Sequence, residues 1–100
     1  MSVYLIGSFD VSDSDAYAPY VPGVMPLLQK HGAEILVADY DAMTLDRQGR
    51  GVNVVIRFES EEKAMAFYND PEYKPVKQIR LDSTSNCTYI LAHEFAPPSQ

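Results

Sequence analysis

Tyrosine is the residue type in this sequence that most readily suggests a binding function. The chain of 100 residues has seven tyrosines and no tryptophan. A buried tyrosine brings a large apolar ring and a hydroxyl group that seeks a hydrogen-bond partner. Such rings can line a pocket and orient a small organic ligand through a few polar contacts. They can equally fill a core that lacks tryptophan. The tyrosines in question are Tyr17, Tyr20, Tyr40, Tyr68 and Tyr73.

Three ionisable side chains could supply such a pocket with polar chemistry. Arg80 stands apart from the other basic residues. It can pair with Asp70 or Glu72, or it can bind a ligand carboxylate through two parallel hydrogen bonds. His31 or Asp39 could transfer a proton, although His31 also suits the last turn of a helix, where positive charge favours the dipole. The pattern assigns no catalytic residue. The predicted ligand-binding residues are Tyr20, His31, Asp39, Tyr68, Tyr73 and Arg80.

Motifs for metal ions, cofactors and covalent catalysis do not occur in the sequence. It has no glycine-rich phosphate loop, nucleophile elbow or HExxH pair. The stretch "GSFDVSDSD" lacks the spaced ligands and the terminal glutamate of a calcium loop. His31, His93, Asp39 and Asp41 are too dispersed for a metal motif. We therefore expect no metal and no cofactor.

Composition narrows the class of protein. The net charge is −6 and the eight Lys and Arg residues are scattered, so we expect no nucleic-acid binding. No apolar run approaches the ~20 residues of a membrane span, so we expect no membrane partner. Cys87 is the single cysteine, which suits a reducing, cytoplasmic location. The length fits one domain, expected over residues 1–96, followed by a flexible C-terminal tail at 97–100.

The helices and strands that position these residues can be predicted from the period of the apolar residues and from the capping, Gly and Pro residues between them. Residues 3–11 and 52–58 alternate as strands. A helix in two pieces is expected after a cap at Ser12, with a kink near Pro22-Gly23 and a stop at Gly32. A strand is expected from residue 33, with a bend near 40–42, followed by a turn at 47–51. After these we expect a helix capped by Ser60 and a second helix that begins at Pro71 or Pro75 and ends at Ser83. The last expected element is a strand at 87–94.

This order of elements predicts a fold and an assembly. It is β-α-β-β-α-β with the second helix split, which is the pattern of the α+β ferredoxin-like sandwich. Its four-stranded antiparallel sheet would carry helices on one face only. The other face remains apolar, so we expect a second copy of the chain to cover it around a two-fold axis. The residues expected on that face are Tyr4, Ile6, Val55, Ile90 and Ala92.

Several stretches also resemble a known family. The most specific part of the resemblance is the set Tyr68, Pro71, Glu72 and Tyr73, followed by Arg80. The stretches are "YLIGSFDVSDSDAYAPYV", "KHGAEILV", "VVIRFES", "AFYNDPEYKPVKQIRL" and "TYILAHEF". Together they resemble the domain-of-unknown-function family numbered 1330, which belongs to the dimeric α+β barrel group. The resemblance implies a ferredoxin-like fold and a homodimer, and it implies no established activity.

Two functional hypotheses remain open at this point. The first is a small-molecule protein that binds a modest organic ligand between helices and sheet, or converts it without metal or cofactor, as some related dimeric barrels do. The second is a non-catalytic dimeric module for binding or regulation, whose aromatic residues are only core. A formed cavity with at least two converging polar groups favours the first hypothesis, and a packed interior favours the second.

Overall fold

The computed structural model describes residues 1–96 and confirms the predicted fold class, α+β and ferredoxin-like. The tail predicted at 97–100 lies outside the described residues. None of the helices within residues 1–96 is long and apolar enough to cross a membrane. In chain order, the elements are β1 (Val3–Val11), α1 (Ser14–Tyr17), α2 (Tyr20–Lys30), β2 (Glu34–Asp39), β3 (Val52–Phe58), α3 (Glu61–Tyr68), α4 (Tyr73–Ser83) and β4 (Thr84–His93).

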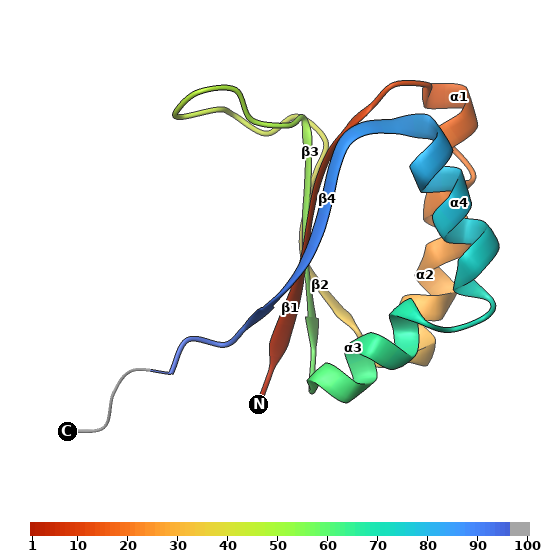
Figure 1. Cartoon of the computed structure of the whole chain (residues 1–100), viewed down its shortest axis with the longest axis vertical. Coiled ribbons are helices and arrows are strands. Elements are labelled where there is room, and N and C mark those ends of the chain that lie inside the picture. The colour runs from red at the N-terminus through yellow and green to blue at the C-terminus, as the bar shows by residue number, and fades with distance from the viewer. Residues whose placement is uncertain (97–100) are drawn as a thin grey trace.

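The strands form one antiparallel sheet in the order β2-β3-β1-β4. Helices α1 to α4 lie on one side of this sheet, and within residues 1–96 the other side carries no helix (Figure 1). The loop between β2 and β3 and the segment that follows β4 both extend toward the side without helices (Figure 1). The sheet is therefore covered on one face and open on the other.

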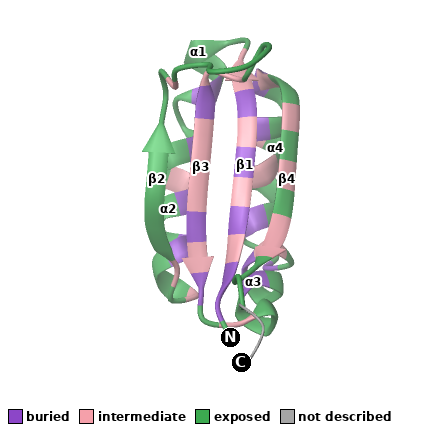
Figure 2. Ribbon diagram, turned by 90° about the vertical axis from the view of Figure 1, so that its left-hand side faces the viewer, coloured by how far each residue is buried: buried purple, intermediate pink, exposed green. Residues whose placement is uncertain are grey.

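Alternation along the central strands separates these two faces. Val3, Leu5, Gly7 and Phe9 of β1 are buried on the helix side, and the residues that alternate with them are less buried (Figure 2). Ile6 lies on the open face, opposite Val55 and Ile90. Because Val37 of β2 lies opposite Val55, an apolar band crosses all four strands. We call these four residues, Val37, Val55, Ile6 and Ile90, the open-face band.

The break in the first helical segment lies earlier than predicted. α1 ends at Tyr17 and α2 begins at Tyr20, so the helical segment is divided before Tyr20 and not at Pro22-Gly23. Pro22 is tolerated because it falls in the first turn of α2, where backbone N–H groups have no partner within the helix. Gly23 allows α2 and α4 to pack closely, because a Cβ at this position would lie 3.2 Å from Val76 Cγ2 of α4.

The segment between the two middle strands also differs from the prediction. β2 ends at Asp39, and its pairing irregularity lies between Ile35 and Val37, not near 40–42. Residues 40–51 form a long loop rather than a tight turn at 47–51. Two large apolar side chains on this loop, Met43 and Leu45, are 82% and 87% exposed.

The helix ends around the α3–α4 corner largely follow their sequence signals. Ser60 caps α3 as predicted, and its Oγ accepts a hydrogen bond from the Lys63 N–H at 3.2 Å. Asp13, rather than Ser12, caps α1. Asp70 accepts from the N–H of Glu72 at 2.9 Å and so shapes the corner before α4. β4 begins at Thr84, earlier than the predicted residue 87, because α4 passes directly into the strand.

Candidate functional site

A cavity of about 210 Å³ lies between α2 and the sheet, and we call it the α2 cavity. Val21 and Met25 of α2 and Ile35 of β2 line it and are each about two-fifths exposed, so it opens between α2 and β2. Its lining is apolar except for tyrosine hydroxyls. The tyrosines that line it are Tyr17, Tyr20, Tyr40 and Tyr89.

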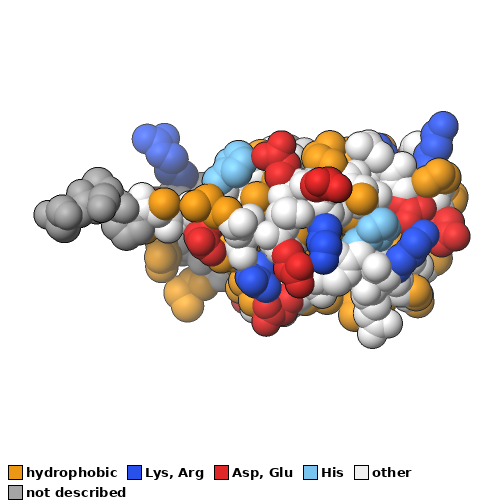
Figure 3. Space-filling model, turned by 90° about the horizontal axis from the view of Figure 1, so that it is seen from below, with side chains coloured by type: hydrophobic (Ala, Val, Ile, Leu, Met, Phe, Trp, Pro, Cys, Tyr) orange, Lys and Arg blue, Asp and Glu red, His pale blue; other side chains and the backbone are white. Residues whose placement is uncertain are grey.

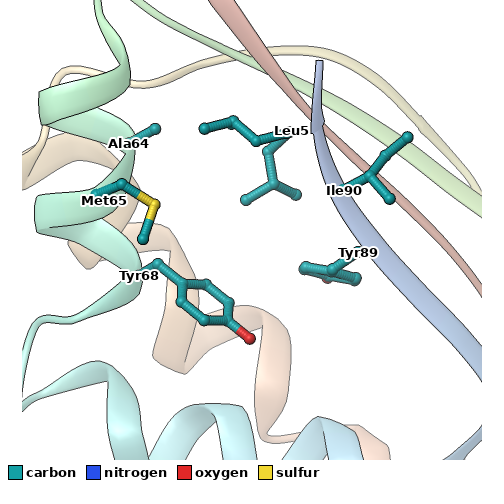
Figure 4. A pocket seen from close by; sticks show the side chains of 7 residues that line it. Leu5, Ala64, Met65, Tyr68, Tyr89 and Ile90 are labelled. Carbon is teal, nitrogen blue, oxygen red and sulfur yellow. The ribbon is translucent and has the colours of Figure 1, made fainter.

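A second cavity of about 210 Å³, the α3 cavity, lies between α3 and β4. Met65 and Tyr68 of α3 extend toward it from one side and residues of β1 and β4 from the other (Figure 4). Leu5 and Tyr89 line both cavities and thus form a shared wall. Gly7 makes room for this wall, because a Cβ at that position would lie 2.5 Å from Tyr89 Cε1.

Three tyrosine hydroxyls meet at the α2 cavity. The Tyr20 and Tyr73 hydroxyl oxygens are 2.9 Å apart, and those of Tyr20 and Tyr89 are 3.4 Å apart. Tyr73 is fully buried behind the two cavity-lining rings. Nearer the mouth, the hydroxyls of Tyr17 and Tyr40 lie 2.8 Å apart. The cavity therefore combines an apolar wall with a compact group of hydrogen-bonding hydroxyls.

The four buried phenols of this group remain neutral at physiological pH. Burial raises the pKa of Tyr17, Tyr20, Tyr73 and Tyr89 well above the ordinary value, because an ionised phenol loses its hydration there. The positive charge of Arg80 opposes this rise in the pKa of all four without overcoming it. The hydroxyls can thus donate and accept hydrogen bonds, but they are poor bases.

Arg80 is buried beside this group, with only 2% of its surface exposed. Its guanidinium carbon lies 3.7 Å from the centroid of the Tyr89 ring, and its Nη1 donates to Cys87 Sγ at 2.9 Å. Its Nε has no hydrogen-bond partner. Among the described residues, no carboxylate forms a salt bridge with Arg80. The pairing with Asp70 or Glu72 considered from the sequence does not occur.

Helical spacing brings Arg80 to this place. Tyr73, Arg80 and Ser83 are the buried residues of α4 and lie on one face of the helix. Tyr68 at the end of α3 is next to them, with its ring centroid 5.9 Å from that of Tyr73. The structure therefore brings together Tyr20, Tyr73 and Arg80 from the predicted set, with Tyr68 on the neighbouring cavity.

The other two predicted residues lie elsewhere. His31 ends α2, and its Nε2 donates to Asp70 Oδ2 at 2.8 Å. Lys30 reaches the same oxygen at 2.9 Å, so the three residues join α2 to the α3–α4 corner. Acidic, basic and histidine side chains lie close together at this end of the molecule (Figure 3). Asp39 lies on the open-face side, where it accepts from the Asp41 N–H.

Sequence reasoning missed two residues of the cluster, Tyr89 and Cys87. A signal for both was present, because alternation in the last strand places them with Leu91 on the helix side. Their contact with Arg80 was not visible from spacing. Within residues 1–96, no group of three His, Cys, Asp or Glu side chains is arranged to hold a metal ion.

The sheet topology and the tyrosine-lined cavity define a ferredoxin-like α+β domain. The chain belongs to the family described as domain of unknown function DUF1330, which matches residues 2–94. A comparison with curated proteins found no match.

Three solved structures show the same fold. A protein of unknown function from Rhodopseudomonas palustris has a TM-score of 0.80 at 13% identity, covering 96% of this chain and 84% of that chain. A dimeric protein of unknown function and ferredoxin-like fold from Bacteroides fragilis has a TM-score of 0.57 at 12% identity, covering 94% and 96%. A candidate antibiotic biosynthesis monooxygenase from Bacteroides thetaiotaomicron has a TM-score of 0.62 at 16% identity, covering 99% and 94%. At these identities the likeness shows the fold alone.

Proposed function

We propose that the protein binds a small organic molecule in the α2 cavity. The observation that carries this proposal is the convergence of the Tyr20, Tyr73 and Tyr89 hydroxyls, with buried Arg80 beside them, at an apolar space. A space that served only as core would not need a buried cation next to it. The arrangement therefore meets the condition that favours a small-molecule protein over a module with a packed interior.

The size of the cavity limits the ligand. An apolar cavity of ~150 Å³ in a protein can hold benzene, and pockets for drug-sized ligands are roughly 300–1,000 Å³. At about 210 Å³, the α2 cavity has room for one substituted aromatic ring or a molecule of similar size. A nucleotide or a flavin does not fit in it.

The lining supports binding more directly than it supports acid–base catalysis. Among the described residues that line the α2 cavity, none is acidic, basic or histidine. Tyr17, Tyr20 and Tyr89 of its lining have raised pKa values and stay protonated. A conversion in this cavity would thus depend on hydrogen bonding to the ligand rather than on a side chain that takes up a proton.

Blocking the mouth tests this proposal. Ala38 of β2 lines the cavity at its open side, so Ala38→Trp should fill the entrance. We expect neutral cinnamamide to bind the wild-type protein saturably, as measured by isothermal titration calorimetry, and to lose this binding in Ala38→Trp. Ala66→Trp is the matched control, since exposed Ala66 lies on α3 and does not line the cavity. Equal binding by all three proteins would contradict the proposal.

We also propose that two copies of the chain pack through their open sheet faces. In the open-face band, Val37 is 43% exposed and Ile90 is 58% exposed. Met43, Leu45 and Phe95 are more than four-fifths exposed, and the segments that carry them extend to the same side of the sheet (Figure 1). A second copy would cover all of these apolar groups at once. The Bacteroides fragilis protein with this fold is described as dimeric, which agrees with the proposal.

A charge placed in the band tests the dimer. We expect Ile90→Glu to shift the protein from dimer to monomer in sedimentation equilibrium, because two carboxylates would be buried at the interface. Leu81→Glu is the control: Leu81 is 48% exposed but lies on α4, on the helix side. A wild-type protein that sediments as a monomer, or an Ile90→Glu variant that remains dimeric, would argue against the proposal.

A further inference from the structure

We propose that the ligand of the α2 cavity is an apolar molecule with a single anionic oxygen group, a carboxylate or an enolate, whose charge is balanced by Arg80. This inference rests on the proposed function, because it names the class of molecule that the same cavity takes. It is argued from the surroundings of Arg80 and from the direction in which the hydroxyl protons must point.

The first observation is a buried charge with no counter-charge. Arginine stays protonated in proteins, and a buried ion is costly unless it is paired. Arg80 is 2% exposed, its Nε has no partner, and the groups around it are the Cys87 thiol, the Tyr89 ring and the neutral Tyr73 hydroxyl. The face of the Tyr89 ring attracts the guanidinium through a cation–π interaction, but it does not neutralise the positive charge. An anionic ligand would therefore supply the counter-charge that the protein itself does not give to Arg80.

The second observation is an excess of hydrogen-bond donors. A guanidinium has five N–H donors and no acceptor, so a hydroxyl oxygen near it accepts and directs its own proton away. The hydroxyls of Tyr73, Tyr20 and Tyr89 form a chain with two oxygen–oxygen contacts. Three neutral hydroxyls have three protons and the two contacts use two of them, which leaves one to donate outside the chain. Tyr20 and Tyr89 line the cavity, so an acceptor oxygen in the cavity can receive it.

The third observation limits the ligand to one charged group. Apart from the hydroxyls, the cavity wall is aliphatic and aromatic, and the described part of the chain places no cation in its lining. A phosphate or a dicarboxylate would leave charge unpaired in apolar surroundings. Arg80 is not itself a lining residue, and it stands behind Tyr89 and the hydroxyl chain. Arg80 is thus a positioning residue that acts on the anion through Tyr20 and Tyr89.

The test compares two probes of nearly the same shape, the anion cinnamate and the neutral amide cinnamamide. We expect the wild-type protein to bind cinnamate about tenfold more tightly than cinnamamide, which corresponds to about 1.4 kcal/mol. In Arg80→Met this preference should disappear, so that the two probes bind with equal affinity. Lys74→Met removes the same charge from the exposed side of α4 and should keep the preference.

Thermal unfolding separates this role from a purely structural one. Arg80→Met removes the desolvation penalty of a buried cation that has no counter-charge, so ligand-free Arg80→Met should melt no lower than wild type. Cinnamate should raise the wild-type Tm and leave that of Arg80→Met unchanged. If Arg80 were structural, Arg80→Met would melt lower and would retain the preference for cinnamate. Should Arg80→Met not fold, Tyr20→Phe removes only a hydroxyl and should also reduce the preference.

The possible results distinguish the two proposals. Equal affinity of the wild-type protein for both probes would overturn the anion inference and leave the proposed function standing. A preference for cinnamate that persists in both Arg80→Met and Tyr20→Phe would overturn it as well. Failure of the wild-type protein to bind either probe would overturn the proposed function and the inference together.

Discussion

Gly7 controls how closely the ring of Tyr89 can approach the sheet. The two residues lie opposite each other on β1 and β4, on the face that the helices cover. A Cβ at Gly7 would lie 2.5 Å from Tyr89 Cε1 and 2.9 Å from Val54 Cγ2. Only a residue without a side chain allows the Tyr89 ring to lie across this position and to separate the two cavities.

Gly7→Ala should therefore destabilise the protein. We expect a loss of about 1–3 kcal/mol, the usual cost of inserting a methyl group into a packed core, measured by urea denaturation. Gly51→Ala is the control, because a Cβ there would meet only Asp10 Oδ1 at an ordinary distance of 3.8 Å. Equal stability of the Gly7→Ala variant and the wild type would show that the Tyr89 ring moves aside freely.

Asp70 is the most heavily hydrogen-bonded carboxylate at the helix corner. Hydrogen bonds from His31, Lys30 and the Glu72 N–H lower the pKa of Asp70 well below its ordinary value of 3.8. Because the folded-state pKa lies below the unfolded one, the ionised group stabilises the fold above about pH 4. This stabilisation is lost as the pH falls below that value toward the folded-state pKa.

Asp70→Asn should lower the Tm by several degrees at neutral pH and reduce the loss of stability on acidification below about pH 4. Thermal unfolding followed by circular dichroism across the acidic range measures both effects. Glu34→Gln is a suitable control, since Glu34 pairs with Arg57 on the exposed surface, where ion pairs contribute little. A variant with the same acid profile as wild type would show that Asp70 is not the group that titrates.

At the scale of the element, one capping residue can be tested against another that the sequence wrongly suggested. Ser60 accepts from the Lys63 N–H at the start of α3. Ser60→Ala should cost about 0.5–2 kcal/mol, measured by chemical denaturation. Ser12→Ala should be close to neutral, because Asp13 caps α1 in its place. Equal effects of the two substitutions would contradict this assignment of caps.

The order and type of the main elements were predictable because their periods are strong. Residues 52–58 form the predicted strand, and alternation in β1 correctly separates the covered face from the open face. The errors concern junctions. The sequence has three prolines in one helical segment, and it does not show which of them lies in a first turn, where no N–H partner is needed. The structure places the break before Tyr20. An irregularity in β2 depends on its pairing with β3, which local sequence does not show.

The candidate site was predictable only where helical spacing determines it. Tyr73 and Arg80, seven positions apart on α4, lie on one buried face. His31 and Asp39 were predicted for their ionisable groups, and the fold directs them to the helix corner and the open-face side instead. Tyr89 joins the cluster through packing across the sheet and against α4, and no short-range pattern encodes that arrangement.

At the scale of the whole molecule, the proposed dimer has a thermodynamic signature. Because association stabilises the folded chains by mass action, the Tm of the wild-type protein should rise with protein concentration. Ile90→Glu should abolish this dependence, whereas Leu81→Glu should retain it. Differential scanning calorimetry over a wide concentration range makes the measurement. A wild-type Tm that is independent of concentration would point to a stable monomer.

The shared wall of the two cavities gives one side chain an influence on ligand length. Tyr89 stands between spaces of equal size, about 210 Å³ each, and Arg80 is stacked on its ring. Rotation of this ring away from the partition would join the two chambers into one passage beneath the helices. An anionic ligand that accepts a hydrogen bond from the Tyr89 hydroxyl would act on the same ring. Selection of ligands by charge and selection by chain length would then depend on the same torsion angle.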